Sequence, residues 1–133
     1  MPAINLKEIE YVTLYTGNNG SDACTCNCPC CSQKNRNRYQ GTIKQAIEMF
    51  KVLPNMKQLY LFGNPDVTVD VDFCNEILSM AVSRNKRVCF STSGVGGKQV
   101  LTKLLNGIPA HMVDYISFSF DGTTKEEMSF LKG

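Results

Sequence analysis

Five of the seven cysteines lie in one short stretch, CTCNCPCC, at residues 24–31. Within it, Cys24, Cys28 and Cys31 have the spacing Cys-x3-Cys-x2-Cys, which no other three cysteines of the chain reproduce. Three thiolates from one short loop can bind three irons of a cubane iron–sulfur cluster, which usually takes four cysteines. With three cysteines, one iron stays open for a ligand that does not come from the protein.

Other chemistries are open to the same stretch. Zinc sites usually combine two cysteine pairs, or cysteines with histidines. The two cysteines outside this stretch, Cys74 and Cys89, do not form a second pair, and we interpret them as small buried apolar residues. The alternative function is a non-catalytic zinc or iron–sulfur binding module, with Cys26 or Cys30 as the fourth ligand. A thiol redox protein is a third hypothesis, but the chain lacks a Cys-x-x-Cys motif that opens a helix.

Composition and charge narrow the class of protein. A chain of 133 residues holds one domain, which we expect to span residues 1–133. Its net charge of +2 is too small to indicate binding to nucleic acid or to an anionic membrane. With no signal sequence and no apolar run that could span a bilayer, we expect a cytoplasmic protein without a membrane partner. Cytosolic thiols are kept reduced, so the cysteines indicate metal binding or catalysis.

Strand and helix patterns alternate along the chain. Four short apolar or aromatic runs predict strands, at residues 10–17, 57–63, 87–94 and 115–122. Apolar residues at helical spacing predict helices at residues 42–53, 72–85, 98–107 and 124–133. Thr42 and Gln45 fit a capping box, and Gly107 is placed to end the third helix. Strands that alternate with helices indicate an α/β fold with parallel strands.

The first β-α unit is the longest, and the segment that makes it longer, residues 17–40, contains the clustered cysteines. They follow the first strand at its carboxyl end, where parallel α/β folds build their sites. Because strand side chains alternate, Ser91 and Ser93 share one face of the third strand, and Ser117 and Ser119 share one face of the fourth. This small, polar face predicts a cavity for a polar ligand. The alternative is that these serines hydrogen-bond to backbone inside a packed barrel core.

With these features the chain resembles the radical S-adenosylmethionine (SAM) superfamily, whose cysteine loop follows the first strand of a partial (β/α)6 barrel. The second strand ends in LFGNPD, which is similar to the family's Gly-Gly-Glu-Pro type motif. Gly63 and Pro65 match that motif, whereas Phe62 and Asn64 replace its first glycine and its glutamate. The third and fourth strands look like the family strands that contact SAM. The resemblance implies a partial (β/α) barrel with about four of its six β-α units present.

The resemblance also implies cofactors and an activity. Cys24, Cys28 and Cys31 would hold a [4Fe-4S] cluster, and the open iron would chelate SAM. Reductive cleavage of SAM would then give a 5′-deoxyadenosyl radical that abstracts hydrogen from a substrate that the sequence does not identify. Polar or backbone contacts to SAM are expected from Gly63, Asn64, Pro65, Ser91, Ser93, Ser117, Ser119 and Cys30. Catalytic residues in the strict sense remain unassigned.

Two of these residues depart from the family pattern. Cys30 stands where the family usually has an aromatic residue near the adenine. Asn64 offers an amide oxygen to the SAM ammonium where the family has a carboxylate, and a neutral acceptor makes the weaker hydrogen bond.

Partners follow from the same resemblance. A one-electron donor such as flavodoxin or ferredoxin is implied, and Lys34, Arg36 and Arg38 could attract an acidic donor. With four β-α units, we expect the chain to be the N-terminal portion of a longer core domain. The fourth strand would then be an edge that pairs through self-association or with a completing C-terminal region.

Overall fold

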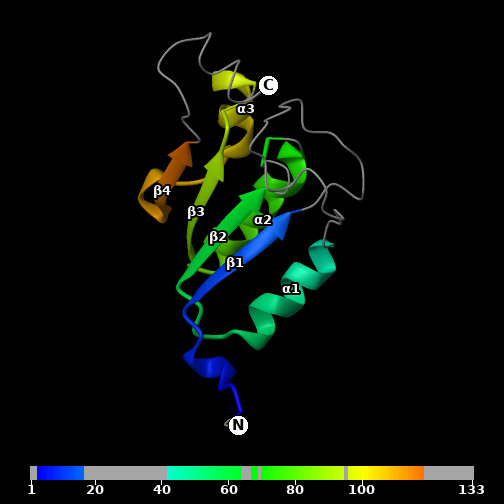
Figure 1. Ribbon diagram of the computed structural model, residues 1–133, viewed down its shortest axis with the longest axis vertical. Helices are drawn as coiled ribbons and strands as arrows, with labels where there is room; N and C mark the ends of the chain where they lie inside the picture. The colour runs from blue at the N-terminus through cyan, green and yellow to red at the C-terminus, as the bar shows by residue number, and fades with distance from the viewer. Residues whose placement is uncertain (1–2, 17–41, 64–66, 69, 95, 119–133) are drawn as a thin grey trace, which may run out of the picture.

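The computed structural model describes residues 3–16, 42–63, 67–68, 70–94 and 96–118 (Figure 1). Over these residues the chain alternates between strands and helices. The strands are β1 (Tyr11–Thr16), β2 (Gln58–Gly63), β3 (Arg87–Thr92) and β4 (Val113–Phe118). The α-helices are α1 (Ile43–Val52), α2 (Val71–Ser83) and α3 (Gly97–Leu104), and short 3-10 helices span Leu6–Glu8 and Ala110–Met112.

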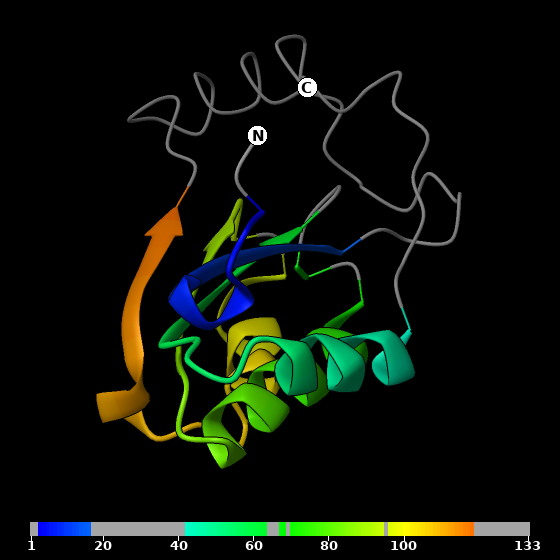
Figure 2. The same ribbon diagram turned by 90° about the horizontal axis from the view of Figure 1, so that it is seen from below.

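The described strands form one parallel sheet in the order β1-β2-β3-β4, so each crossover moves to the next strand along. Figure 2 shows α1, α2 and α3 on the same side of this sheet. The predicted mixed α/β fold with parallel strands is therefore confirmed. Within the described part, the sheet is open and has β1 and β4 at its edges.

Local sequence signals start the first two helices. Thr42 Oγ1 accepts a hydrogen bond from the Gln45 backbone N–H at 3.1 Å, and the Gln45 side chain accepts one from the Thr42 N–H at 2.8 Å. This is the predicted capping box, which satisfies two donors that a helix start leaves free. Asp70 caps α2 in a similar way, because its side chain accepts from the Phe73 N–H at 3.3 Å.

Several predicted boundaries were wrong by two or three residues: the second helix ends at Ser83 rather than at 85, and the third strand ends at Thr92 rather than at 94. The third helix ends at Leu104 rather than at 107, and Gly107, with φ of 75°, belongs to the turn that follows the helix. The fourth strand begins at Val113 rather than at 115, because Val113 already pairs with Val88 ahead of a register shift. The predicted helix at 124–133 lies outside the described residues.

A single hydrophobic core lies between the helices and the face of the sheet that they cover. The strand side chains that face this core lie at every second position, and the helix side chains that face it recur along one side of each helix, as periods of two and 3.6 require. The fully buried side chains of this core include Leu59, Leu61, Val67, Ile77, Leu78, Val88, Phe90 and Leu104. No helix in the described ranges is long and apolar enough to cross a membrane.

Candidate functional site

The face of the sheet opposite the helices, here called the open face, carries the candidate site. Its side chains form three rows across the strands, in the register of the sheet. From the amino to the carboxyl ends of the strands, the first row is Tyr11, Gln58 and Arg87, and Asp114 joins it through its side chain at the register shift of β4. The second row is Thr13, Tyr60, Cys89 and Tyr115, and the third row is Tyr15, Phe62, Ser91 and Ser117. The three described α-helices leave this face uncovered (Figure 2). Within these rows, formal charge is confined to the amino ends of the strands, whereas aromatic rings and hydroxyl groups occur in all three rows.

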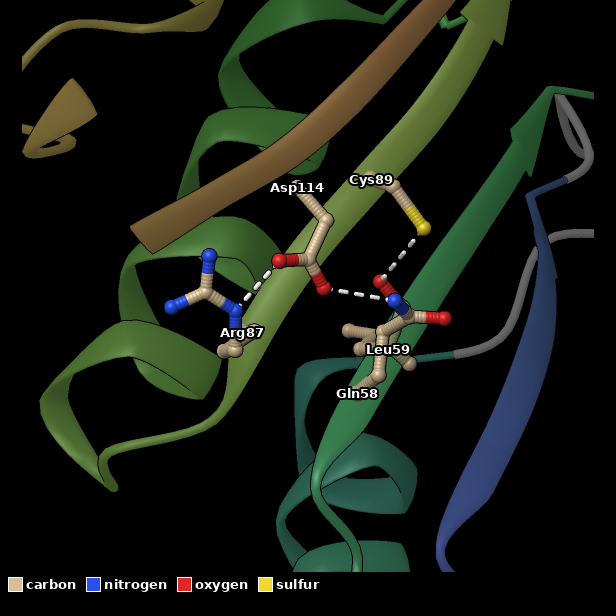
Figure 3. A network of polar contacts seen from close by, with 5 residues as sticks. All are labelled: Gln58, Leu59, Arg87, Cys89 and Asp114. Carbon is tan, nitrogen blue, oxygen red and sulfur yellow. Dashed lines mark hydrogen bonds and ion pairs between the residues drawn. The ribbon is translucent and has the colours of Figure 1, made fainter. Parts of the chain in front are cut away.

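The row at the amino ends is an electrostatic link between strands. Arg87 Nε is hydrogen-bonded and ion-paired with Asp114 Oδ1, and Gln58 Nε2 donates to Asp114 Oδ2 at 2.6 Å (Figure 3). The hydrogen bond from Gln58, together with that from Arg87, lowers the pKa of the Asp114 carboxyl. Because both carboxylate oxygens have partners, this row connects β4 to β2 across β3.

The middle row contains a buried thiol. Cys89 has an exposed fraction of 0%, and its Sγ donates to the Leu59 carbonyl at 3.8 Å (Figure 3). Burial raises the pKa of the Cys89 thiol, and hydrogen bonding with that thiol raises the pKa of Tyr115. A protonated, buried thiol is a poor nucleophile and a poor metal ligand. The interpretation of Cys89 as a buried residue is confirmed, as it is for Cys74 at 1% exposure.

The row at the carboxyl ends, here called the carboxyl-end row, is aromatic on one half and hydroxylic on the other. The Tyr15 and Phe62 rings, on β1 and β2, have centroids 5.3 Å apart. Ser91 and Ser117 are register partners on β3 and β4. From the row below, the Tyr60 hydroxyl is hydrogen-bonded to Ser91 Oγ. Rings and hydroxyls with no formal charge suit a ligand that has both flat apolar parts and hydrogen-bonding groups.

Several predicted site residues come together at this end of the sheet. Gly63 is the last residue of β2 and pairs with Thr16 of β1. Ser91 and Ser117 share the open face, as their alternation predicted. Ser93 follows the end of β3, and its hydroxyl oxygen is buried. The remaining predicted residues lie outside the described part of the chain: Cys24, Cys28, Cys30, Cys31, Asn64, Pro65 and Ser119.

No protein-family model, curated protein or solved structure matches the chain. The candidate site therefore depends on the sequence motif and on the geometry of the sheet. The described residues contain no group of three or more histidine, cysteine or acidic side chains that could hold a metal ion. The predicted iron ligands belong to residues 17–41, between the carboxyl end of β1 and the start of α1, outside the described ranges.

One residue of the open face was missed by sequence reasoning. Tyr60 lies on β2, and its hydroxyl reaches a predicted ligand contact on β3. The alternation of side chains that placed Ser91 on the open face would also have placed Tyr60 there, on the same face as Phe62. That Tyr60 meets Ser91 depends on the register between β2 and β3, in which Tyr60 pairs with Cys89 and Phe62 with Ser91.

Proposed function

We propose that the chain is the cluster-binding and SAM-binding part of a radical SAM enzyme, with its sheet as part of a (β/α) barrel. The observation that carries the proposal is the Cys24, Cys28 and Cys31 triad directly after the first strand of a parallel α/β sheet. A Cys-x3-Cys-x2-Cys triad alone is a short motif. Its position in a β-α context makes it specific, because short motifs gain their meaning from the structure around them.

The side chains at the carboxyl ends of β3 and β4 fit such a ligand chemically. SAM carries ribose hydroxyls, a carboxylate and an ammonium group, all of which need hydrogen-bonding partners when they leave water. Ser91 and Ser117 present two adjacent hydroxyls on the open face, and each hydroxyl both donates and accepts. Tyr15 and Phe62 add aromatic surface beside them. The donor set supports binding of a polar nucleoside-like molecule at this end of the sheet.

The roles of the chain's own residues follow from this proposal. Cys24, Cys28 and Cys31 hold the three irons that have protein ligands. Such a cluster, when bound, would supply one-electron reduction of SAM, the chemistry that leads to hydrogen abstraction from the substrate. Gly63 and Asn64 would bind the methionine amino group, with Pro65 completing their motif. Ser91, Ser93, Ser117 and Ser119 would contact the rest of SAM, and Cys30 takes the position of the family's residue near the adenine. The electron comes from a partner such as flavodoxin or ferredoxin.

A second candidate function is favoured by the two further cysteines of the loop. Cys26 and Cys30 would each complete a set of four thiolates with Cys24, Cys28 and Cys31. A site with four protein thiolates is closed, as in structural zinc sites, and leaves no position for SAM. This alternative is a non-catalytic zinc or iron–sulfur module.

Anaerobic reconstitution with iron and sulfide, followed by addition of SAM and dithionite, tests the proposal. We expect a brown protein that converts SAM to 5′-deoxyadenosine and methionine, detected by mass spectrometry. The control is the same protein with Cys28→Ala, which should form neither product. A colourless protein with one zinc, or a cluster whose spectrum does not respond to SAM, would support the alternative function.

A further inference from the structure

We infer that Tyr60 is a positioning residue for this site: its hydroxyl orients the Ser91 hydroxyl, so that Ser91 donates a hydrogen bond to the bound ligand. The inference rests on the proposed function, because the ligand is SAM. It assigns a role to a residue on β2 that does not itself have to touch the ligand. It also assigns Ser91 a donor role rather than an acceptor role.

The geometry of the open face holds Tyr60 in place before a ligand binds. Its ring centroid lies 6.1 Å from that of Phe62 and 6.2 Å from that of Tyr115, so that rings from two strands flank it. Rings at such separations stabilise one another in edge-on or tilted arrangements. The Tyr60 hydroxyl is therefore held towards Ser91, which lies two residues beyond Cys89, the register partner of Tyr60. Both side chains are half-buried.

The chemistry of the two hydroxyls sets the direction of the hydrogen bond. A serine hydroxyl has one donor and two acceptor positions and rotates freely when it has no partner. A phenolic hydroxyl is a stronger donor than an aliphatic one, so Tyr60 donates to Ser91 Oγ. The Ser91 proton is then left to point away from Tyr60, towards an acceptor. The ligand atom that meets this Ser91 proton is consequently an acceptor, such as a ribose or carboxylate oxygen of SAM.

The benefit of this arrangement is preorganisation. A hydroxyl that is already oriented loses less rotational freedom when the ligand binds, and this lower cost appears as affinity. A purely structural hydrogen bond between β2 and β3 would have a different signature. It would change the stability of the fold while leaving the affinity for SAM unaltered.

A double-mutant cycle on the cluster-loaded protein separates these roles. The variants are Tyr60→Phe, Ser91→Ala and the two combined, and the readout is the Kd for SAM from anaerobic calorimetry. Tyr11→Phe is the matched control, because Tyr11 lies on the same face with 67% of its surface exposed, in the row at the amino ends of the strands. Iron content and melting temperature are measured for each variant.

We expect Tyr60→Phe to weaken SAM binding about three- to tenfold, the size of one lost hydrogen bond, without loss of iron. In the Ser91→Ala background, the same change should alter the Kd by less than about twofold, since coupled residues give non-additive effects. Ser91→Thr keeps the hydroxyl and should bind SAM almost as the unchanged protein does. Tyr11→Phe should have no effect on the Kd.

Three outcomes would overturn the inference, and they can be told apart. If the unchanged protein binds SAM but Tyr60→Phe binds it equally well, Tyr60 has no positioning role and the proposed function stands. Effects of Tyr60→Phe and Ser91→Ala that multiply in the double variant would show that Tyr60 does not act through Ser91. If the cluster-loaded, unchanged protein binds no SAM, the proposed function fails and the inference fails with it.

Discussion

Replacing Phe90 by alanine tests the layered arrangement on which the candidate site depends. Phe90 is fully buried in β3, in the core between the sheet and the helices. Removing a buried phenylalanine side chain costs about 3–5 kcal/mol, because transfer free energy is lost and a cavity remains. A domain has only about 5–15 kcal/mol of stability in total. The variant should therefore fold, but melt roughly 10–20 °C earlier.

Urea denaturation followed by circular dichroism measures this loss. The matched control is Phe118→Ala in the neighbouring strand β4, where the same residue type is 51% exposed. Its loss should be about 1 kcal/mol, in proportion to the smaller buried area. The m-value should stay constant in both variants, since the surface exposed on unfolding hardly changes.

A cost below about 1 kcal/mol for Phe90→Ala, or a greater cost for Phe118→Ala, would refute the reasoning. Either result would mean that the helices do not cover the face of the sheet that carries Phe90. The serines on the alternate positions would then not lie on an open face, and the candidate site would lose its basis.

Three further changes probe other contacts. Gly96→Ala should destabilise the fold by about 1–3 kcal/mol in thermal melts, because Gly96 has φ of 88° and an added Cβ would lie 2.9 Å from Val100 Cβ. The pKa of the Asp114 carboxyl is lowered from 3.8, so ionised Asp114 stabilises the fold above that pH, and this stabilisation is lost as pH falls through the lower pKa of the folded state. Acid titrations of the free energy of unfolding should show this loss, and Asp114→Asn should abolish this part of the pH dependence. The pKa of Cys89 is raised from 9.0, so stability should fall as pH rises above 9.0, and Cys89→Ala should flatten that fall.

Much of the fold could be predicted because its signals are local. The capping box of Thr42 and Gln45 lies within one helical turn, and it was confirmed at the start of α1. The alternation of Val88 and Phe90 with Cys89 and Ser91 needs only the period of a strand, and it correctly separated the core face from the open face.

The missed features depend on contacts between distant parts of the chain. The early start of β4 comes from a register shift opposite Val88 and Cys89, which no local pattern of β4 reveals. The same irregularity accompanies the contact of Asp114 with Gln58, two strands away. The hydrogen bond between Tyr60 and Ser91 likewise requires the relative register of β2 and β3. Sequence periods indicate which face a side chain occupies, but not which neighbour it meets there.

The iron content of single-cysteine variants after anaerobic reconstitution tests the central claim most directly. Each cysteine of the triad should hold a different iron, so Cys24→Ala, Cys28→Ala and Cys31→Ala should each lose the cluster. Cys26→Ala is the matched control within the same loop and should keep about four irons per chain. The spectrum of that control should still change when SAM is added. If Cys26→Ala loses iron as completely as Cys28→Ala, the ligand set is not the triad, and the assignment of the chain as a radical SAM enzyme is contradicted.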